Sequence, residues 1–174
     1  MKSGLRKVVL TAHLFFSVGW TGAVCAYLAL GLSASRSAEA GTIRAAWIGM
    51  ELVGWFVIVP LAVGSLITGI LIALGTSWGL FRHYWVIFSL ALTVFAVVIL
   101  LLHMPTVSAS ASVARQADID RLTQLGGDLF HPGLGLALLL VIQVLNVFKP
   151  RGMTRHGQRA RAARGSTAVP GGLV

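Results

Sequence analysis

Charged side chains are scarce in this chain of 174 residues, because only 11% are Asp, Glu, Lys or Arg. A soluble domain carries about 25%. Hydrophobic residues make up 56% of the chain, and its mean hydropathy is +0.85. This balance excludes an ordinary water-soluble domain and predicts one compact domain surrounded mostly by lipid.

Cysteine is almost absent as well, since Cys25 is the only one. A disulfide framework and a CxxC site are therefore excluded. Cys25 lies in an apolar run, where we expect a small, buried core residue. The sequence also lacks P-loop and HExxH motifs, and its GxSxG match at residues 75–79 stands in a short connection between two apolar runs rather than between a strand and a helix, so hydrolytic or phosphoryl-transfer chemistry is not indicated. If the protein is an enzyme at all, a redox role in electron transfer is the one left.

Acidic residues are few, five against 14 basic ones, and the net charge is +9. The basic residues lie beside the apolar runs, a pattern typical of membrane topology rather than of nucleic-acid binding. One set of connecting segments carries ten basic residues and no acidic one: Lys2, Arg6, Lys7, Arg82, Lys149, Arg151, Arg155, Arg159, Arg161 and Arg164. The positive-inside rule then predicts that both termini are cytoplasmic, in a protein of the bacterial cytoplasmic membrane.

Four long apolar runs predict an all-α fold, an integral membrane four-helix bundle in residues 1–152. The predicted spans are residues 8–32, 45–74, 84–104 and 131–148. The first is too long for the apolar region of a signal peptide, so we expect it to be retained. Pro60 is expected to kink the second span and Pro105 to end the third. Residues 153–174 are basic without apolar periodicity, which predicts a largely disordered cytoplasmic tail.

The connections between the spans carry signals of their own. The short stretch 75–80 predicts an antiparallel hairpin of spans two and three. Between spans three and four, the apolar spacing of Ala117, Leu122, Leu125 and Leu129 predicts a short amphipathic helix on the membrane surface, ended by two glycines. In span four, Gln143 and Asn146 are interpreted as joining helices.

Ionisable residues inside spans are costly, so four histidines are functional candidates. The predicted topology puts His13 and His83 in the inner leaflet and His103 and His131 in the outer one. Two imidazoles from facing helices are a common axial ligand pair for haem. Each pair therefore predicts a haem b site, and both together an electron-transfer path across the membrane. Glycines in spans one and two would let a flat macrocycle approach the backbone.

Helical geometry limits this hypothesis. His83 and His103 are 20 positions apart, which places them about 200° apart around an ideal helix. Either two sites lie between different helix pairs, or only one pair is real. Histidines at a membrane boundary also occur among lipid headgroups, and small residues in spans are ordinary packing devices.

A second hypothesis uses Glu51, which the topology puts in the leaflet of His103 and His131. Two imidazoles and one carboxylate are suited to Zn²⁺, Fe²⁺ or Cu²⁺, and Met104 adds a soft ligand for copper. Alternatively, Glu51 serves structure alone, bonded to Trp47 or to Arg44. A third hypothesis is an accessory or structural subunit of a membrane complex, with a redox or other membrane-protein partner or as an oligomer.

Several stretches resemble a family of small actinobacterial membrane proteins of unknown function. They are Thr11–Ala12–His13 with Val18–Gly19–Trp20, MELVGWFVIVPLAVGSLITG, WGLFRHYWV, LLLHMP and KPRGMTRHG, within residues 8–157. This resemblance implies a four-span fold and no activity. Through the four histidines alone, the chain also resembles CopD-like copper-resistance proteins and transmembrane di-haem b cytochromes.

Overall fold

The regular structure of the chain is helical. The computed structural model describes residues 2–75, 80–150, 152–155 and 157–159. Within them lie α1 (Ser3–Arg36), α2 (Ala40–Val53), the π-helical turn η1 (Gly54–Ile58), α3 (Val59–Gly75), α4 (Tyr84–Gln116), α5 (Ile119–Leu125) and α6 (Phe130–Phe148).

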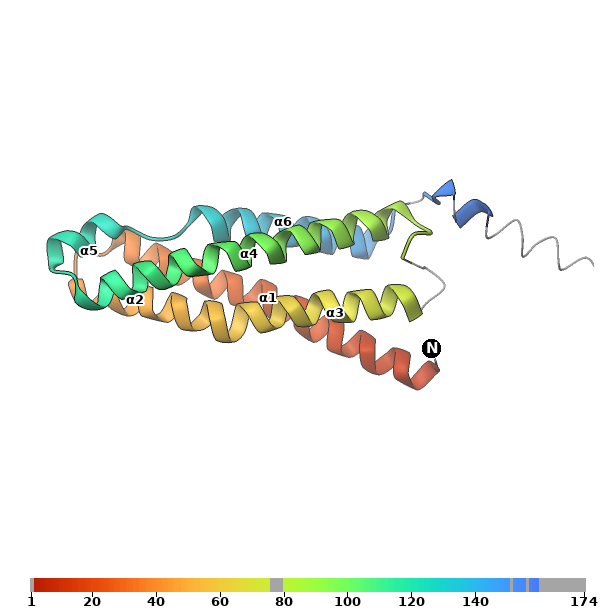
Figure 1. The fold of residues 1–174 in the computed structure, drawn as a ribbon, viewed down its shortest axis with the longest axis horizontal. Helices are drawn as coiled ribbons and strands as arrows, with labels where there is room; N and C mark the ends of the chain where they lie inside the picture. Colours follow the sequence, from red (N-terminus) through yellow and green to blue (C-terminus); the bar gives the residue numbers. More distant parts are fainter. Residues whose placement is uncertain (1, 76–79, 151, 156, 160–174) are drawn as a thin grey trace, which may run out of the picture.

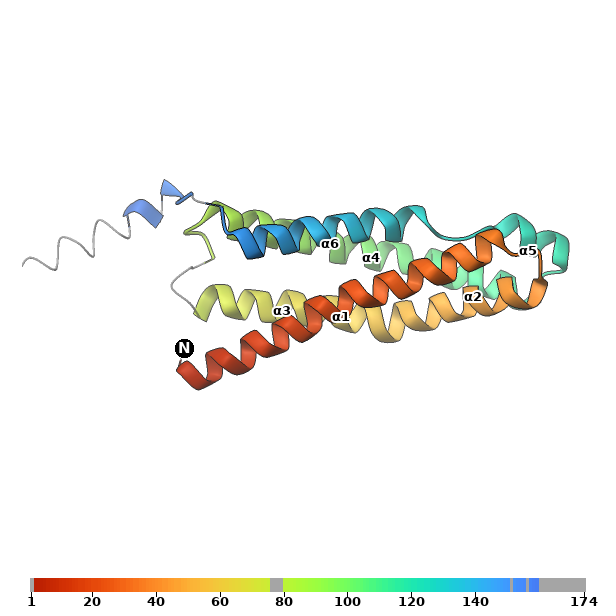
Figure 2. The ribbon, with the colours of Figure 1, turned by 180° about the vertical axis from the view of Figure 1, so that it is seen from behind.

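Four segments are long and apolar enough to cross a membrane: Ser3–Arg36, Ala40–Gly75, Tyr84–Gln116 and Ile119–Phe148. They run side by side along the long axis of the molecule (Figure 1). The predicted all-α membrane four-helix bundle is therefore confirmed. Seen from the front and from behind, α5 and the turn between α1 and α2 lie at the end far from the N-terminus (Figures 1 and 2). This end is called the distal end below.

The outside of the bundle is apolar, as contact with lipid requires. Large side chains such as Phe15, Phe56 and Phe130 are exposed, whereas the interior holds Tyr27 and Met104 among other buried residues. Cys25 is also exposed, so its expected burial is wrong. In this stretch of α1 the buried residues are Val24 and Tyr27, so the inward face of the helix runs through them and Cys25 lies outside it.

The structure accommodates Pro60 and Pro105 in different ways. Pro60 follows a π-helical turn, in which the Val59 N–H bonds to the Gly54 carbonyl. Proline has no N–H to donate and crowds the preceding turn, and a π-turn accommodates both effects. Pro105 does not end the third span, because α4 continues through it to Gln116. Buried residues on both sides of Pro105 hold the helix together, among them Met104, Val107 and Ala111.

Helix α4 is therefore longer than the predicted span. Its 33 residues rise about 50 Å, against roughly 30 Å of hydrocarbon. The distal part is fastened to α2, since the Arg44 guanidinium donates to the carbonyls of Ala114 and Ala117. A helix that outruns the bilayer places its distal residues at or beyond the lipid boundary.

The predicted helix before span four exists as α5. Leu122 of α5 is completely buried, and α5 packs against α2, so the helix covers the distal end of the bundle. Its buried side therefore packs on protein, and its place on a membrane surface stays a prediction. Gly126 ends α5 with a φ of 58°, as the glycine pair predicted.

Polar side chains join the spans inside the bundle. The Gln143 amide donates to Thr21 of α1 at 2.6 Å, and the Ser89 hydroxyl of α4 donates to Asn146 at 2.9 Å. The interpretation of Gln143 and Asn146 as helix-joining residues is confirmed. Such bonds stabilise a membrane bundle because lipid offers polar groups no alternative partner.

The two remaining expectations fall mostly outside the described residues. Positions 76–79 of the predicted hairpin turn lie outside them, as do 156 and 160–174 of the predicted disordered tail. The described start of the tail packs against the beginning of α4. There, the Thr154 hydroxyl donates to the Phe81 carbonyl, and the Thr154 N–H donates to the Arg82 carbonyl.

Candidate functional site

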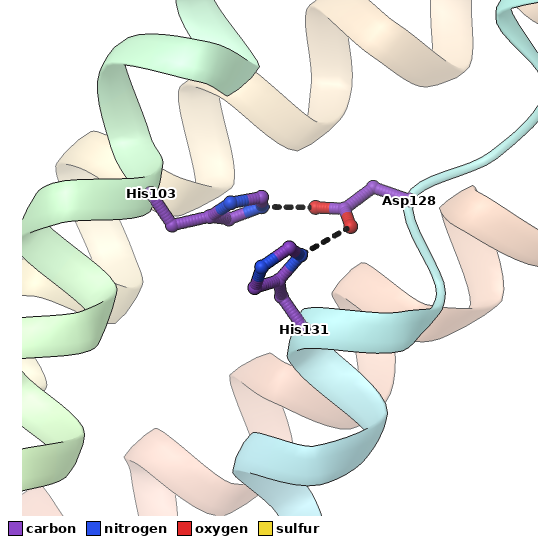
Figure 3. Close-up of side chains that lie close together, drawn as sticks. All are labelled: His103, Asp128 and His131. Atoms are coloured by element: carbon purple, nitrogen blue, oxygen red, sulfur yellow. Dashed lines mark hydrogen bonds and ion pairs between the residues drawn. The ribbon is translucent and has the colours of Figure 1, made fainter.

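Three side chains with metal-ligating atoms meet near the distal end: His103 from α4, Asp128 from the loop before α6, and His131 from the first turn of α6. One ligating atom from each lies within 4.8 Å of the others. Figure 3 shows the two imidazoles and the carboxylate pointing toward one another. This convergence of three segments is the candidate site.

The strongest contact in the site joins His103 to Asp128. His103 Nε2 lies 2.6 Å from Asp128 Oδ2. The same oxygen accepts a hydrogen bond from the Tyr27 hydroxyl at 2.8 Å. An ionised carboxylate is purely an acceptor, and two donors on one oxygen match that form. The site therefore holds a negative charge between a phenol and an imidazole.

His131 lies beside the other oxygen of the Asp128 carboxylate. Its Nδ1 lies 3.9 Å from Asp128 Oδ1. Its ring stacks on that of His103, with ring centres 4.1 Å apart and planes inclined by 23°. The side chain of His131 is 51% exposed, against 16% for His103 and 9% for Asp128. The site is therefore closed on the protein side and open at His131.

The loop that carries Asp128 is held by two helices that supply no ligand. The indole of Trp47, on α2, donates to the Gly126 carbonyl at 3.1 Å. On α1, Gly31 packs so closely that a Cβ there would lie 2.6 Å from the Asp128 carbonyl oxygen. A Cβ on Gly127 would lie 1.9 Å from the Gly31 oxygen. Only glycine at both positions permits this contact.

The charge along the bundle favours a cation at this end. The basic residues at the opposite end are Lys2, Arg6 and Lys7 at the start of α1, and Lys149 directly after the end of α6. All five acidic residues of the chain belong to segments of the distal half: Glu39, Glu51, Asp118, Asp120 and Asp128. Four arginines, Arg36, Arg44, Arg115 and Arg121, belong to the same segments, so five acidic and four basic side chains give the distal half a formal charge of −1. The opposite end is basic, and a cation is therefore repelled less at the distal end.

A small metal ion fits the three residues after modest movements. Imidazole nitrogen and carboxylate oxygen bind zinc at about 2.0–2.2 Å, which puts neighbouring ligand atoms of a tetrahedron roughly 3.3 Å apart. The contacts of Asp128 with His103 and His131, 2.6 and 3.9 Å, lie on either side of this value. Stacked rings cannot both point at one ion, so one must turn. His131 is half exposed and has the room to do so.

A haem does not fit between the same two histidines as they lie. Axial imidazoles stand on opposite faces of the iron, each with a bond of about 2 Å, so their ring centres are well over 4 Å apart. The observed rings face each other at 4.1 Å. Two of the glycines that were expected to admit a macrocycle, Gly54 and Gly64, are covered by side chains instead. A Cβ on Gly64 would lie 2.7 Å from Phe16, and one on Gly54 2.5 Å from Met104.

The two inner histidines have separate surroundings. His13 Nδ1 lies 3.2 Å from the Ser65 carbonyl oxygen and 3.0 Å from the Thr68 hydroxyl, both on α3. His83 lies just before α4 and pairs with Met153 in an isolated antiparallel bridge. His13 thus connects α1 to α3, and the described contacts do not join it to His83.

Glu51 does not belong to the candidate site. It accepts an ion-paired hydrogen bond from Arg115 of α4, so neither Trp47 nor Arg44, its two expected partners, holds it. Met104 is also directed elsewhere, because its sulfur is 2.8 Å from the Cβ position of Gly54. The structure therefore places Asp128, rather than Glu51, beside His103 and His131, and binding of an ion stays a prediction.

Asp128 and Tyr27 are the residues that sequence reasoning missed. Asp128 stands three residues before His131 in the connection that leads into the fourth span. A carboxylate and an imidazole three positions apart at a helix start are a usable signal for a ligand pair. Tyr27 lies 101 positions from its partner Asp128, and the sequence contains no local signal for that contact.

Comparison of the chain with protein-family models, with curated proteins and with solved structures gives no match. The resemblance to the actinobacterial membrane-protein family stays a prediction, and so do the looser resemblances to CopD-like proteins and di-haem cytochromes.

Proposed function

We propose that this multi-pass membrane protein binds a divalent transition-metal ion at the distal end of its bundle, through His103, Asp128 and His131. The observation that carries the proposal is the convergence of their ligating atoms within 4.8 Å from two distant stretches of the chain, α4 and the start of α6 with the loop before it. The positive-inside rule, which predicts cytoplasmic termini, assigns the distal end to the outer face of a bacterial cytoplasmic membrane.

The donor set indicates the class of metal. Two imidazoles and one carboxylate suit zinc, iron(II), cobalt(II) and copper(II) better than magnesium or calcium, which favour oxygen ligands. Structural zinc sites usually have four protein ligands, whereas three protein ligands leave a position open. The exposed side of His131 gives that position access to solvent. The proposal is therefore an exchangeable ion rather than a buried structural one.

Metal binding itself changes the contacts of the ligands. The hydrogen atom between His103 Nε2 and Asp128 Oδ2 has to move to Nδ1 when Nε2 binds an ion, because a ligating nitrogen needs its lone pair. His131 would have to turn away from its stacked position. The ion would then replace one hydrogen bond and one ring contact with metal–ligand bonds, and each imidazole would stay neutral with its hydrogen on the other ring nitrogen.

The experiment is a metal titration of the detergent-purified protein after removal of any histidine tag. Zn²⁺ and Co²⁺ are added to metal-free protein, followed by desalting and elemental analysis. We expect about one ion per chain for wild type. The double variant His103→Ala/His131→Ala should lose it, and Asp128→Asn should bind much more weakly.

Glu51→Gln is the matched control, because it removes the other half-buried carboxylate in the distal half. It should bind as wild type does. Equal metal content in wild type and in the His103→Ala/His131→Ala variant would overturn the proposal. If Glu51→Gln lost the metal and Asp128→Asn kept it, the ligands would be Glu51, His103 and His131, the set expected from the sequence.

A further inference from the structure

The hydroxyl of Tyr27 is placed to control Asp128. Tyr27 is on α1, which supplies none of the three proposed ligands, and its side chain is buried, with 3% of the residue exposed. The hydroxyl donates to Asp128 Oδ2 at 2.8 Å. A buried phenol has one hydrogen to donate, and breaking its bond to the carboxylate oxygen would leave a buried donor without a partner, which costs free energy.

This hydrogen bond persists when the other one is given up. In the metal-free site, Oδ2 accepts from both Tyr27 and His103. Once His103 binds an ion through Nε2, that nitrogen no longer carries a hydrogen atom. The Tyr27 hydroxyl is then the remaining donor to Asp128 Oδ2. The hydroxyl therefore fixes the rotation of the carboxylate while the other oxygen, Oδ1, stays on the side of His131.

The same stretch of α1 also fixes the backbone of Asp128. Gly31 lies one turn after Tyr27, and its missing Cβ leaves room for the Asp128 carbonyl oxygen. Tyr27 acts on the side chain and Gly31 on the main chain. Helix α1 therefore determines where the carboxylate lies without touching the ion.

We infer that Tyr27 is a positioning residue of the metal site, acting through the carboxylate of Asp128. This inference rests on the proposed function, because it gives a role to a neighbour of the same ion. Hydrogen-bond partners of metal ligands orient them, and their loss typically lowers metal affinity about 10- to 100-fold. The expected consequence is a weaker site with an altered ligand field.

The test compares Tyr27→Phe with Tyr84→Phe, using Co²⁺ as the probe. Phenylalanine keeps the ring and removes only the hydroxyl. Tyr84 is the other tyrosine of the chain; it is 49% exposed and begins α4 at the opposite end of the bundle. Affinity is measured by titration, and the visible d–d bands of Co²⁺ are recorded at saturation. Circular dichroism monitors helix content and thermal unfolding of the metal-free proteins.

We expect Tyr27→Phe to bind Co²⁺ roughly 10- to 100-fold more weakly, with shifted d–d bands and unchanged helix content, and Tyr84→Phe to match wild type. A Tyr27→Phe protein with the affinity and the bands of wild type would overturn the role of Tyr27 and leave the metal site standing. Weaker affinity with unchanged bands and a lower unfolding temperature would also overturn it, as a purely structural effect. Wild-type protein that binds no Co²⁺ at these residues would overturn the proposed function, and this inference with it.

Discussion

Arg115 of α4 donates to the carboxylate of Glu51 on α2, across the interface between these two helices. The two residues are 64 positions apart in the chain, and their pairing removes Glu51 from the neighbourhood of the histidines. Arg115 is 43% exposed and Glu51 19%, so water screens the charges in part. The pair is an interhelical tie, and the candidate site takes its carboxylate from elsewhere.

Neutralising this pair should affect stability slightly and metal binding hardly at all. For Glu51→Gln we expect a loss of less than about 1 kcal/mol in the free energy of unfolding, because exposed ion pairs contribute little. Thermal unfolding followed by circular dichroism measures it. Arg115→Gln should give a similar loss, and the double variant should lose no more than either single one. Additive losses would show that the two side chains do not stabilise each other.

Haem should not bind between His103 and His131. Their stacked rings are too close to stand on opposite faces of an iron, and Phe16 and Met104 cover glycines that were expected to admit a macrocycle. We expect protein expressed with ample haem to show no Soret band that depends on these histidines. A reduced-minus-oxidised spectrum is the measurement. Sharp α and β bands that vanish in His103→Ala/His131→Ala would restore the haem hypothesis.

A methyl group at Gly31 should damage the site through the backbone of Asp128. In Gly31→Ala, the new Cβ would lie 2.6 Å from the Asp128 carbonyl oxygen, so the loop has to move. We expect a loss of about 1–3 kcal/mol in the free energy of unfolding, the usual effect of overpacking, together with weaker metal binding. Gly22→Ala on the same helix is the control, since nothing lies within 4 Å of its Cβ position. If both variants behave alike, the close contact at Gly31 has no energetic importance.

Metal binding should weaken as the pH falls. A histidine ligand must be neutral, so protons compete with the ion for the imidazole nitrogen. With two such ligands, lowering the pH should reduce the affinity for Zn²⁺ steadily. Isothermal titration in buffers of different ionisation enthalpy also measures the protons released. Affinity that stays constant as the pH falls would contradict ligation by histidine.

The π-helical turn should tolerate a side chain at Gly54 once Met104 is shortened. A Cβ at Gly54 would lie 2.5 Å from the terminal methyl of Met104. Gly54→Ala alone should be destabilising, and Met104→Ala alone should cost about 2–5 kcal/mol because it leaves a cavity. We expect the double variant to be more stable than the sum of the single losses by roughly 1 kcal/mol or more. Chemical or thermal unfolding of the four proteins completes the cycle, and simple additivity would mean that the two residues do not compete for this space.

The sequence by itself determined the fold class, the approximate spans and the helix-joining roles of Gln143 and Asn146. These properties follow from composition and local periodicity. Exposing backbone groups or charge to lipid costs free energy at each residue separately, whatever the residue packs against. The sequence also placed His103 and His131 in one leaflet, since position along a span measures depth.

Tertiary structure decided which polar groups meet. Glu51 and Asp128 were both plausible partners for the two histidines, and depth alone could not separate them. The choice depends on the rotation of α2, which brings Glu51 to Arg115, and on the close contact of Gly31 with Gly127, which brings Asp128 to His103. Packing also carried α4 past Pro105 and turned α5 onto the end of the bundle. Contacts between distant segments depend on the shapes of whole helices, so they leave no local pattern in the chain.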